Sequence, residues 1–116
     1  MQDRPTASEL VEAIREFLER DVMQSVEGRV RFHTRVAVNA LGILERELRL
    51  GPELDVADRA RLSELLGHDD DIPTLTAELA RRIRDGSLDD RRAEVIAAVQ
   101  ESVRAKLLVA NPGYVG

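Results

Sequence analysis

The stretch that decides the fold is residues 29–50, RVRFHTRVAVNALGILERELRL. At about 100° per residue, its apolar side chains fall on one arc that covers roughly half of a helix circumference. The members of this arc are Phe32, Ile43, Val36, Ala40, His33, Leu44, Ala37, Val30, Leu48 and Leu41. An arc this wide contacts two or three neighbours, so the pattern predicts a central helix from about Arg29 to Leu50 that ends at Gly51-Pro52.

The residues before this stretch predict one further helix. Thr6-Ala7-Ser8-Glu9 has the form of a capping box, so the helix is expected to begin near Thr6. Apolar side chains then recur at helical spacing, and this face is expected to be buried. They are Leu10, Ile14, Phe17, Leu18 and Val22.

The residues after the stretch predict three shorter helices, because Gly and Pro divide this half of the chain. Asp55 is a candidate N-cap of the first of them. The second is expected to pack through Leu75, Leu79 and Ile83, and the third presents the apolar residues Val95, Ile96, Val99, Val103 and Leu107. The expected helices cover about Val56 to Leu66 before Gly67, the residues after Asp71 and Pro73 up to Gly86, and Asp89 or Asp90 up to Asn111-Pro112.

These elements together define the expected fold class. Short connections between successive helices favour antiparallel neighbours, so we expect an all-α, compact up-and-down bundle of about five helices. The chain has 116 residues, close to the commonest domain size. Residues 1–116 are therefore expected to form a single helical domain.

Composition narrows the possible functions. The net charge is −5 and aromatic residues are only 3%, which argues against nucleic-acid binding through a basic surface or stacking rings. Without cysteine there is no disulfide framework or thiol nucleophile. The first residues lack the apolar core of a signal peptide, and no apolar run is long enough to cross a membrane. We therefore expect a cytoplasmic protein without cofactors, membrane contact or nucleic-acid partners.

The charge is unevenly distributed, and the central helix is basic. Residues 29–51 contain five arginines and two acids, a local charge of +3. Four of the arginines fall within about 60° of one another on the helix, with Gly42 in their midst. They are Arg31, Arg35, Arg46 and Arg49. This arginine arc either docks a phosphate-bearing ligand or an acidic partner surface, or pairs with glutamates of the first helix or acids of residues 52–71.

Two further residues of the same helix complete the set of candidate binding residues. His33 lies within the apolar arc, so it is either a hydrogen-bonded core residue or a general base or pH-sensitive group in a cleft. Asn39 lies at the polar edge, where it can cap a neighbouring helix or bind a ligand amide. The candidate binding residues are therefore Arg31, Arg35, Asn39, Arg46, Arg49 and His33.

Catalytic and metal sites have little support. The string His68-Asp69-Asp70-Asp71 has the residue types of a divalent-cation site, but it follows a glycine in an expected loop that would not hold ligands rigidly. A solvated loop with an aspartate N-cap for the next helix is the alternative. The serines lack a G-x-S-x-G context, and no Gly-rich phosphate loop occurs. We expect no catalytic residue and no metal ligand.

Three stretches carry a family resemblance: residues 2–6 at the start, residues 31–41 in the central helix, and Asn111-Pro112-x-Tyr114 at the end. Together they resemble an uncharacterised bacterial family of small helical proteins, often encoded beside aminoglycoside-phosphotransferase-like kinases and acyl-CoA dehydrogenases. The resemblance implies a partner rather than a reaction.

Three functional hypotheses follow. The first is a non-catalytic accessory domain whose arginine arc docks the phosphotransferase-like or acyl-CoA dehydrogenase partner. The second is a small-ligand binder or enzyme for a phosphorylated or CoA-linked substrate, which requires a pocket that holds His33, Asn39 and an arginine together. The third is a homodimer through surplus apolar surface on the central and the last helix.

Overall fold

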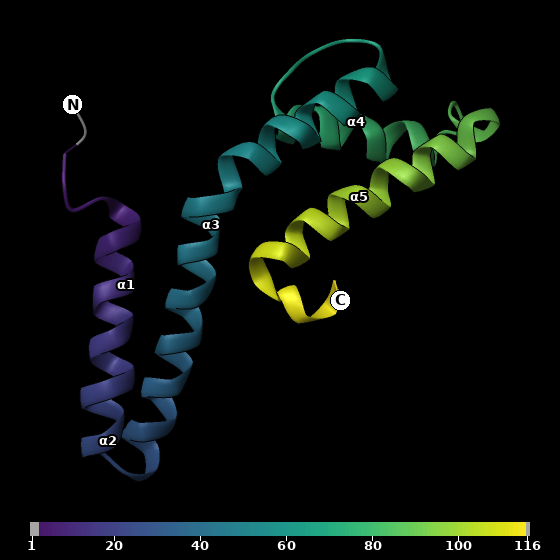
Figure 1. Cartoon of the computed structure of the whole chain (residues 1–116). Helices are drawn as coiled ribbons and strands as arrows, with labels where there is room; N and C mark the ends of the chain where they lie inside the picture. The colour runs from purple at the N-terminus through teal and green to yellow at the C-terminus, as the bar shows by residue number, and fades with distance from the viewer. Residues whose placement is uncertain (1–2, 116) are drawn as a thin grey trace. The chain divides into compact units, whose positions relative to one another are not determined.

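The computed structural model describes residues 3–115 and divides the chain into two compact units, Met1–Gly51 (unit 1) and Pro52–Gly116 (unit 2). Over the described residues it contains four helices and no strand, so the all-α class is confirmed and the helix count is lower than about five (Figure 1). The first helix comprises α1 (Ala7–Phe17), a π-helical turn (Leu18–Val22) and α2 (Met23–Ser25). The others are α3 (Gly28–Leu66), α4 (Ile72–Arg84) and α5 (Arg92–Ala110), with 3-10 turns at Asp89–Arg91 and Pro112–Tyr114. The up-and-down bundle stays a prediction.

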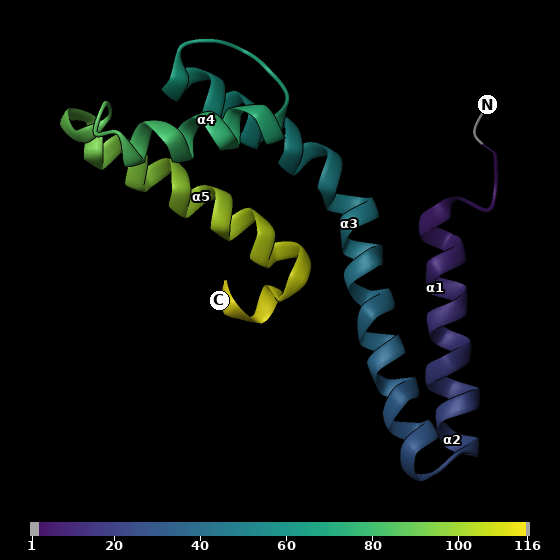
Figure 2. The same ribbon diagram turned by 180° about the vertical axis from the view of Figure 1, so that it is seen from behind.

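Unit 1 is a helical hairpin in which α1 and the first part of α3 lie side by side in both ribbon views (Figures 1 and 2). The predicted capping box at its start is confirmed. The Glu9 amide donates to the Thr6 hydroxyl and the Thr6 amide donates to the Glu9 carboxylate, each over 3.1 Å. At the turn, Gly28 has a φ of +62°, which a residue with a side chain rarely adopts, and α3 begins there.

The predicted end of the central helix at Gly51-Pro52 is wrong, because α3 continues through both residues to Leu66. Asp55 consequently lies inside the helix and is not an N-cap. Proline in a helix interior removes one backbone hydrogen bond and crowds the preceding turn, at a cost of about 3 kcal/mol. Favourable helix formers on either side of Pro52 and the packing of the helix in unit 2 offset a penalty of this size.

The predicted burial of the apolar faces in unit 1 is also wrong. On α1, Leu10, Ile14 and Phe17 are all at least half exposed. The apolar arc of α3 is likewise open, and its exposed members are Val30, Phe32, Val36, Ile43, Leu44 and Leu48. The buried residues of the hairpin are few, among them Val11 on α1 and Thr34 and Val38 on α3. Two helices cover only a narrow strip of each other, so an arc of half a circumference stays uncovered within this unit.

Unit 2 packs the end of α3 with α4 and α5 around one aliphatic core. Its members are Leu62, Leu65, Leu66, Leu75, Leu79, Leu88 and Val95. Leu75 is fully buried. The predicted packing of α4 through Leu75 and Leu79 is therefore confirmed, while Ile83 of the same predicted face is 46% exposed.

Arg91 of the Asp89–Arg91 turn and Arg82 of α4 donate hydrogen bonds to carbonyls at the carboxyl end of α3. The Arg91 guanidinium donates to the Leu65 carbonyl over 2.8 Å, and that of Arg82 donates to the Leu66 carbonyl over 3.4 Å. The last carbonyls of a helix have no partner within it, so these bonds replace water at a part-buried helix end. The chain then leaves the helix through Gly67 at a φ of +85°, as the predicted stop requires.

Most of the remaining boundaries in unit 2 agree with the sequence. The exception is the start of the last helix, because Asp89 and Asp90 lie in a 3-10 turn and α5 begins at Arg92. Asp71 caps α4, since its carboxylate accepts from the Thr74 amide over 2.8 Å. The helix ends at Arg84, two residues before Gly86. At the other end of the unit, α5 ends at Ala110 directly before Asn111-Pro112.

Candidate functional site

The arginine arc on α3 is only partly neutralised within the chain. Arg35 and Arg49 are exposed and Arg31 is half-buried. None of these three makes an ion pair or hydrogen bond within residues 3–115. The expected pairing with glutamates of the first helix is therefore not formed by these three arginines in the described part of the chain.

Arginine side chains lie close to Gly42. A Cβ atom at this position would lie 3.6 Å from Nη1 of Arg46 and 3.9 Å from Cζ of Arg15. Arg15 reaches this place from α1 and donates to the Glu45 carboxylate on α3 over 3.1 Å. These distances are ordinary van der Waals contacts, so Gly42 lies beside the charged groups that join the two helices, and they do not require a glycine there.

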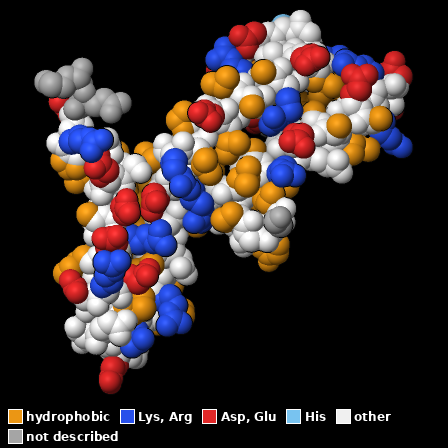
Figure 3. Space-filling model, in the orientation of Figure 1, with side chains coloured by type: hydrophobic (Ala, Val, Ile, Leu, Met, Phe, Trp, Pro, Cys, Tyr) orange, Lys and Arg blue, Asp and Glu red, His pale blue; other side chains and the backbone are white. Residues whose placement is uncertain are grey.

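Charged side chains cover one side of the unit 1 hairpin. Figure 3 shows acidic and basic side chains interspersed over α1 and the first part of α3. A hollow of about 200 Å³ on this side is lined by Glu12, Arg15, Glu16, Glu19, Arg20 and Glu45. The lining contains more carboxylates than guanidinium groups, so this hollow itself does not favour an anionic ligand.

His33 and Asn39 are both exposed, which overturns the expected burial of His33. The His33 ring stands edge-on to Phe32 with centroids 5.5 Å apart, and its Nε2 accepts from Nε of Arg29 over 3.5 Å. Six residues along a helix correspond to a rotation of about 240°, so His33 and Asn39 point to different sides of α3. The pocket that would hold both with an arginine is not formed on this helix.

The string from His68 to Asp71 connects helices within unit 2. Asp69 accepts two bonds from Arg59, of 2.8 and 3.1 Å, and one from the Ser63 hydroxyl of 3.0 Å. Its bonds to Arg59 lower the pKa of Asp69, and the same contact raises the pKa of Arg59. Among residues 3–115, no three His, Asp or Glu side chains are grouped so that they could hold a metal ion.

His68 contributes a second connection, to α4. Its Nε2 lies 2.7 Å from a carboxylate oxygen of Glu78. This hydrogen bond raises the pKa of His68 and lowers the pKa of Glu78. His68 and Asp69, which resembled part of a cation site in the sequence, therefore hold the loop between α3 and α4 through their hydrogen bonds to both helices.

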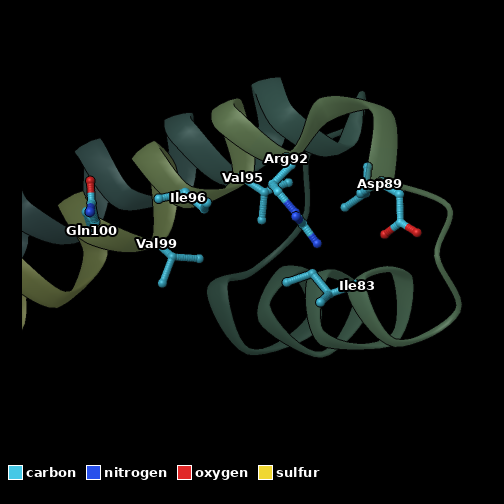
Figure 4. A pocket seen from close by; sticks show the side chains of 8 residues that line it. Ile83, Asp89, Arg92, Val95, Ile96, Val99 and Gln100 are labelled. Carbon is cyan, nitrogen blue, oxygen red and sulfur yellow. The ribbon is translucent and has the colours of Figure 1, made fainter.

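Sequence reasoning missed a groove between α4 and α5 in unit 2. Its volume is about 430 Å³, and it is lined by Ile83, Leu88, Asp89, Arg92, Val95, Ile96, Val99 and Gln100. Figure 4 shows Ile83 on α4 and Val95 and Val99 on α5 around the same space, with Arg92 extending into it and Asp89 at one end. The walls are aliphatic and the charged groups stand at the rim.

A second hollow adjoins the first along α5. It has a volume of about 240 Å³ and shares the side chain of Val99 with the larger one. Thr76 and Leu79 of α4 and Val103 and Lys106 of α5 contribute to its lining. Together the two hollows follow α5 from Val95 to Lys106, about 16 Å at 1.5 Å per residue. We call them the α4–α5 groove.

The groove leaves a periodic row of α5 side chains open. Ile96 is 49%, Val99 39% and Val103 51% exposed. Their spacing was visible in the sequence as one apolar face of the last helix, and Val95 of that face is buried as expected. The periodicity alone does not say which of these side chains another element of the chain covers.

Comparisons with known proteins give a family and no activity. Neither the search of curated proteins nor the search of solved structures found a match. None of the helices within residues 3–115 combines the length and the apolar character that crossing a bilayer requires. A family model described as a domain of unknown function, DUF6285, matches residues 24–114. Two of the three stretches that carried the resemblance lie within this span, and the expectation of an uncharacterised family is confirmed. With this match over most of its length, the chain belongs to the DUF6285 family of domains of unknown function.

Proposed function

We propose that this protein is a non-catalytic interaction domain whose α4–α5 groove binds an amphipathic helix of a partner protein. The observation that carries the proposal is the row Ile96, Val99 and Val103, left 39–51% exposed along the groove. Contiguous exposed apolar surface on a small domain marks an interaction site more often than it marks an unused surface.

The shape and chemistry of the groove favour a helix as its occupant. A length of about 16 Å corresponds to roughly three helical turns of a ligand, enough for apolar anchors at positions i, i+3 or i+4, and i+7. The rim carries Asp89 and Arg92 towards one end and Lys106 towards the other. Charged residues at both ends of an apolar strip would set the direction in which the helix binds.

The resemblance suggests the identity of the partner. It implies a phosphotransferase-like kinase or an acyl-CoA dehydrogenase encoded nearby, and an accessory role for this domain. The arginines without an ion pair, Arg31, Arg35 and Arg49, provide a separate surface for acidic residues of the same partner. Charged contacts of this kind mainly accelerate association and select the partner, whereas the apolar groove would supply most of the affinity.

Binding to the purified kinase-like and dehydrogenase proteins tests the proposal, with the dissociation constant measured by calorimetry. We expect Val99→Glu to weaken binding at least about tenfold, because the carboxylate would be buried against aliphatic side chains. Val56→Glu is the matched control, since Val56 is 72% exposed and does not line the groove. Unchanged binding in the Val99 variant would rule out the groove as the docking site.

The arginine surface has its own test. Reversing Arg31, Arg35 and Arg49 to Glu should slow association and reduce its salt dependence, with little change in the dissociation rate. Equal association rates for this variant and the wild type at low salt would exclude a role for these arginines.

A second candidate function is the binding of a small CoA-linked ligand in the same groove. A volume of about 430 Å³ lies within the range of about 300–1,000 Å³ usual for ligand sites. The aliphatic walls suit an acyl chain, and Arg92 at the rim suits a phosphate. Titration with octanoyl-CoA separates the two functions: saturable binding that Val99→Glu abolishes supports a ligand site, and its absence leaves the protein partner.

A further inference from the structure

We propose that two copies of this chain associate through the apolar face of unit 1, with their α3 helices antiparallel. In this arrangement Arg29 of one copy meets Glu47 of the other. The apolar face consists of Leu10, Ile14, Phe17, Val30, Val36, Ile43, Leu44 and Leu48. This face belongs to a different unit from the α4–α5 groove, so an experiment that disproves the dimer leaves the proposed partner site untouched, and the reverse also holds.

The eight side chains lie on one side of the hairpin or on the back of α3, whereas the exposed Phe32 is turned towards Arg35. On α1 and on α3 the apolar arc is rotated by roughly 100–140° from the strip where the two helices touch. On both helices the arc is rotated in the same sense when viewed along the chain. Because the two helices run in opposite directions, this rotation brings both arcs to the same side of the hairpin. The charged residues Glu12, Glu16 and Arg35 are rotated the other way. Unit 1 is therefore amphipathic as a whole, with one apolar side and one charged side.

The area of this face is sufficient for a dimer. The eight side chains are between 38% and 56% exposed. Taking roughly 180 Å² for a fully exposed side chain of this size, the face offers on the order of 700 Å². A standard protein interface buries roughly 600–1,000 Å² of each partner, and single exposed side chains scattered over a surface do not approach this value.

The charges within the apolar arc argue for a second copy as the occupant. Arg29 and Glu47 are 18 residues apart, which is five helical turns, so they lie on one line along α3 and within the arc. Neither makes an ion pair within residues 3–115, and the described contact of the Arg29 side chain is its long hydrogen bond to His33. The apolar strip thus carries a cation at one end and an anion at the other. In an antiparallel pair of identical strips, each cation therefore meets the anion of the second copy.

A two-fold axis through the middle of this strip generates the pairing. It places Arg29 opposite Glu47 of the second copy twice, and it pairs Val36 with Ala40 near the axis. Such self-complementarity is what an isologous interface requires. The result is a four-helix arrangement in which each hairpin supplies the cover that the other lacks.

Sedimentation of the full-length chain over a range of concentrations tests the proposal. We expect a dimer for the wild type, and a dissociation constant at least about a hundredfold higher for Val36→Glu, which places two carboxylates near the axis. Val36 is half exposed, so the substitution removes no packing within the hairpin. Val56→Glu, the same change at a 72% exposed position of the same helix outside the apolar face, should leave the dimer intact.

A charge exchange tests the antiparallel pairing. Arg29→Glu and Glu47→Arg should each raise the dissociation constant about tenfold, because like charges then face each other at both ends. The double variant should return to within about threefold of the wild type. A monomeric wild type, an unaffected Val36→Glu variant, or single and double charge variants with additive losses would overturn the proposal.

Discussion

Pro52→Ala should stabilise the protein, because Pro52 lies inside α3. Its missing N–H leaves the Leu48 carbonyl without the usual partner four residues on, and its ring crowds the same turn. Alanine in a helix interior is about 3 kcal/mol more favourable than proline. Replacing proline also raises the conformational entropy of the unfolded chain, which lowers the free energy of unfolding by about 0.4–1 kcal/mol. The net expectation is a rise of about 2 kcal/mol in the free energy of unfolding.

Urea unfolding followed by circular dichroism measures this change. With a slope of about 1–3 kcal/mol per molar urea, the midpoint should rise by about 1 M. Pro73→Ala is the matched control, because Pro73 lies in the first turn of α4, where its N–H would have no partner within the helix. We expect that variant to be slightly destabilised, by up to about 1 kcal/mol.

The two proline variants separate two structures of α3. If Pro52→Ala behaves like Pro73→Ala, the helix ends at Gly51 in solution and the sequence-based boundary is right after all. If it stabilises as expected, one continuous helix runs from Gly28 to Leu66.

Two further predictions concern unit 2. Leu75→Ala should lower the free energy of unfolding by about 3 kcal/mol in urea titrations, because Leu75 is fully buried, while Val56→Ala at a 72% exposed position should change it by less than about 0.5 kcal/mol. His68→Gln should lower the melting temperature most near pH 5.5 and least above pH 8. The pKa of His68 is raised, so its pair with Glu78 stabilises the fold fully below the ordinary histidine pKa of 6.5 and loses this effect as the pH rises through the raised pKa. Glu78, with its lowered pKa, contributes above 4.5 and loses its contribution as pH falls, so a difference independent of pH would refute the role of the pair.

Several helix ends could be predicted correctly from short local patterns of residues. The capping box at Thr6, the N-cap at Asp71 and the stop at Gly67 all occur where predicted. Each depends on a hydrogen bond or a φ value within a few residues, so the chain around it is sufficient to specify it. Pro52 differs because its penalty of a few kcal/mol is smaller than what flanking helix and tertiary packing supply.

Burial was harder to predict than helix position. The apolar arc of residues 29–50 showed that this helix needs cover, but amphipathicity does not identify the molecule that provides it. The exposure of His33 follows from the same gap, since its assignment to the core depended on that arc being buried. The α4–α5 groove was hidden for a related reason: whether Val99 and Val103 meet α4 or leave a hollow depends on how two helices pack, and not on their own periodicity.

The two arginines at the carboxyl end of α3 also bear on how unit 2 folds. The carbonyls of Leu65 and Leu66 receive their partners from residues 26 and 16 positions later in the chain. These two carbonyls therefore acquire their arginine partners only when α4 and the turn that leads into α5 have both docked. Partly folded forms that lack either helix leave a carbonyl without its arginine, which disfavours them. Because these sequence separations are short, the search for the contacts is fast, and unit 2 should fold rapidly and in a single cooperative step.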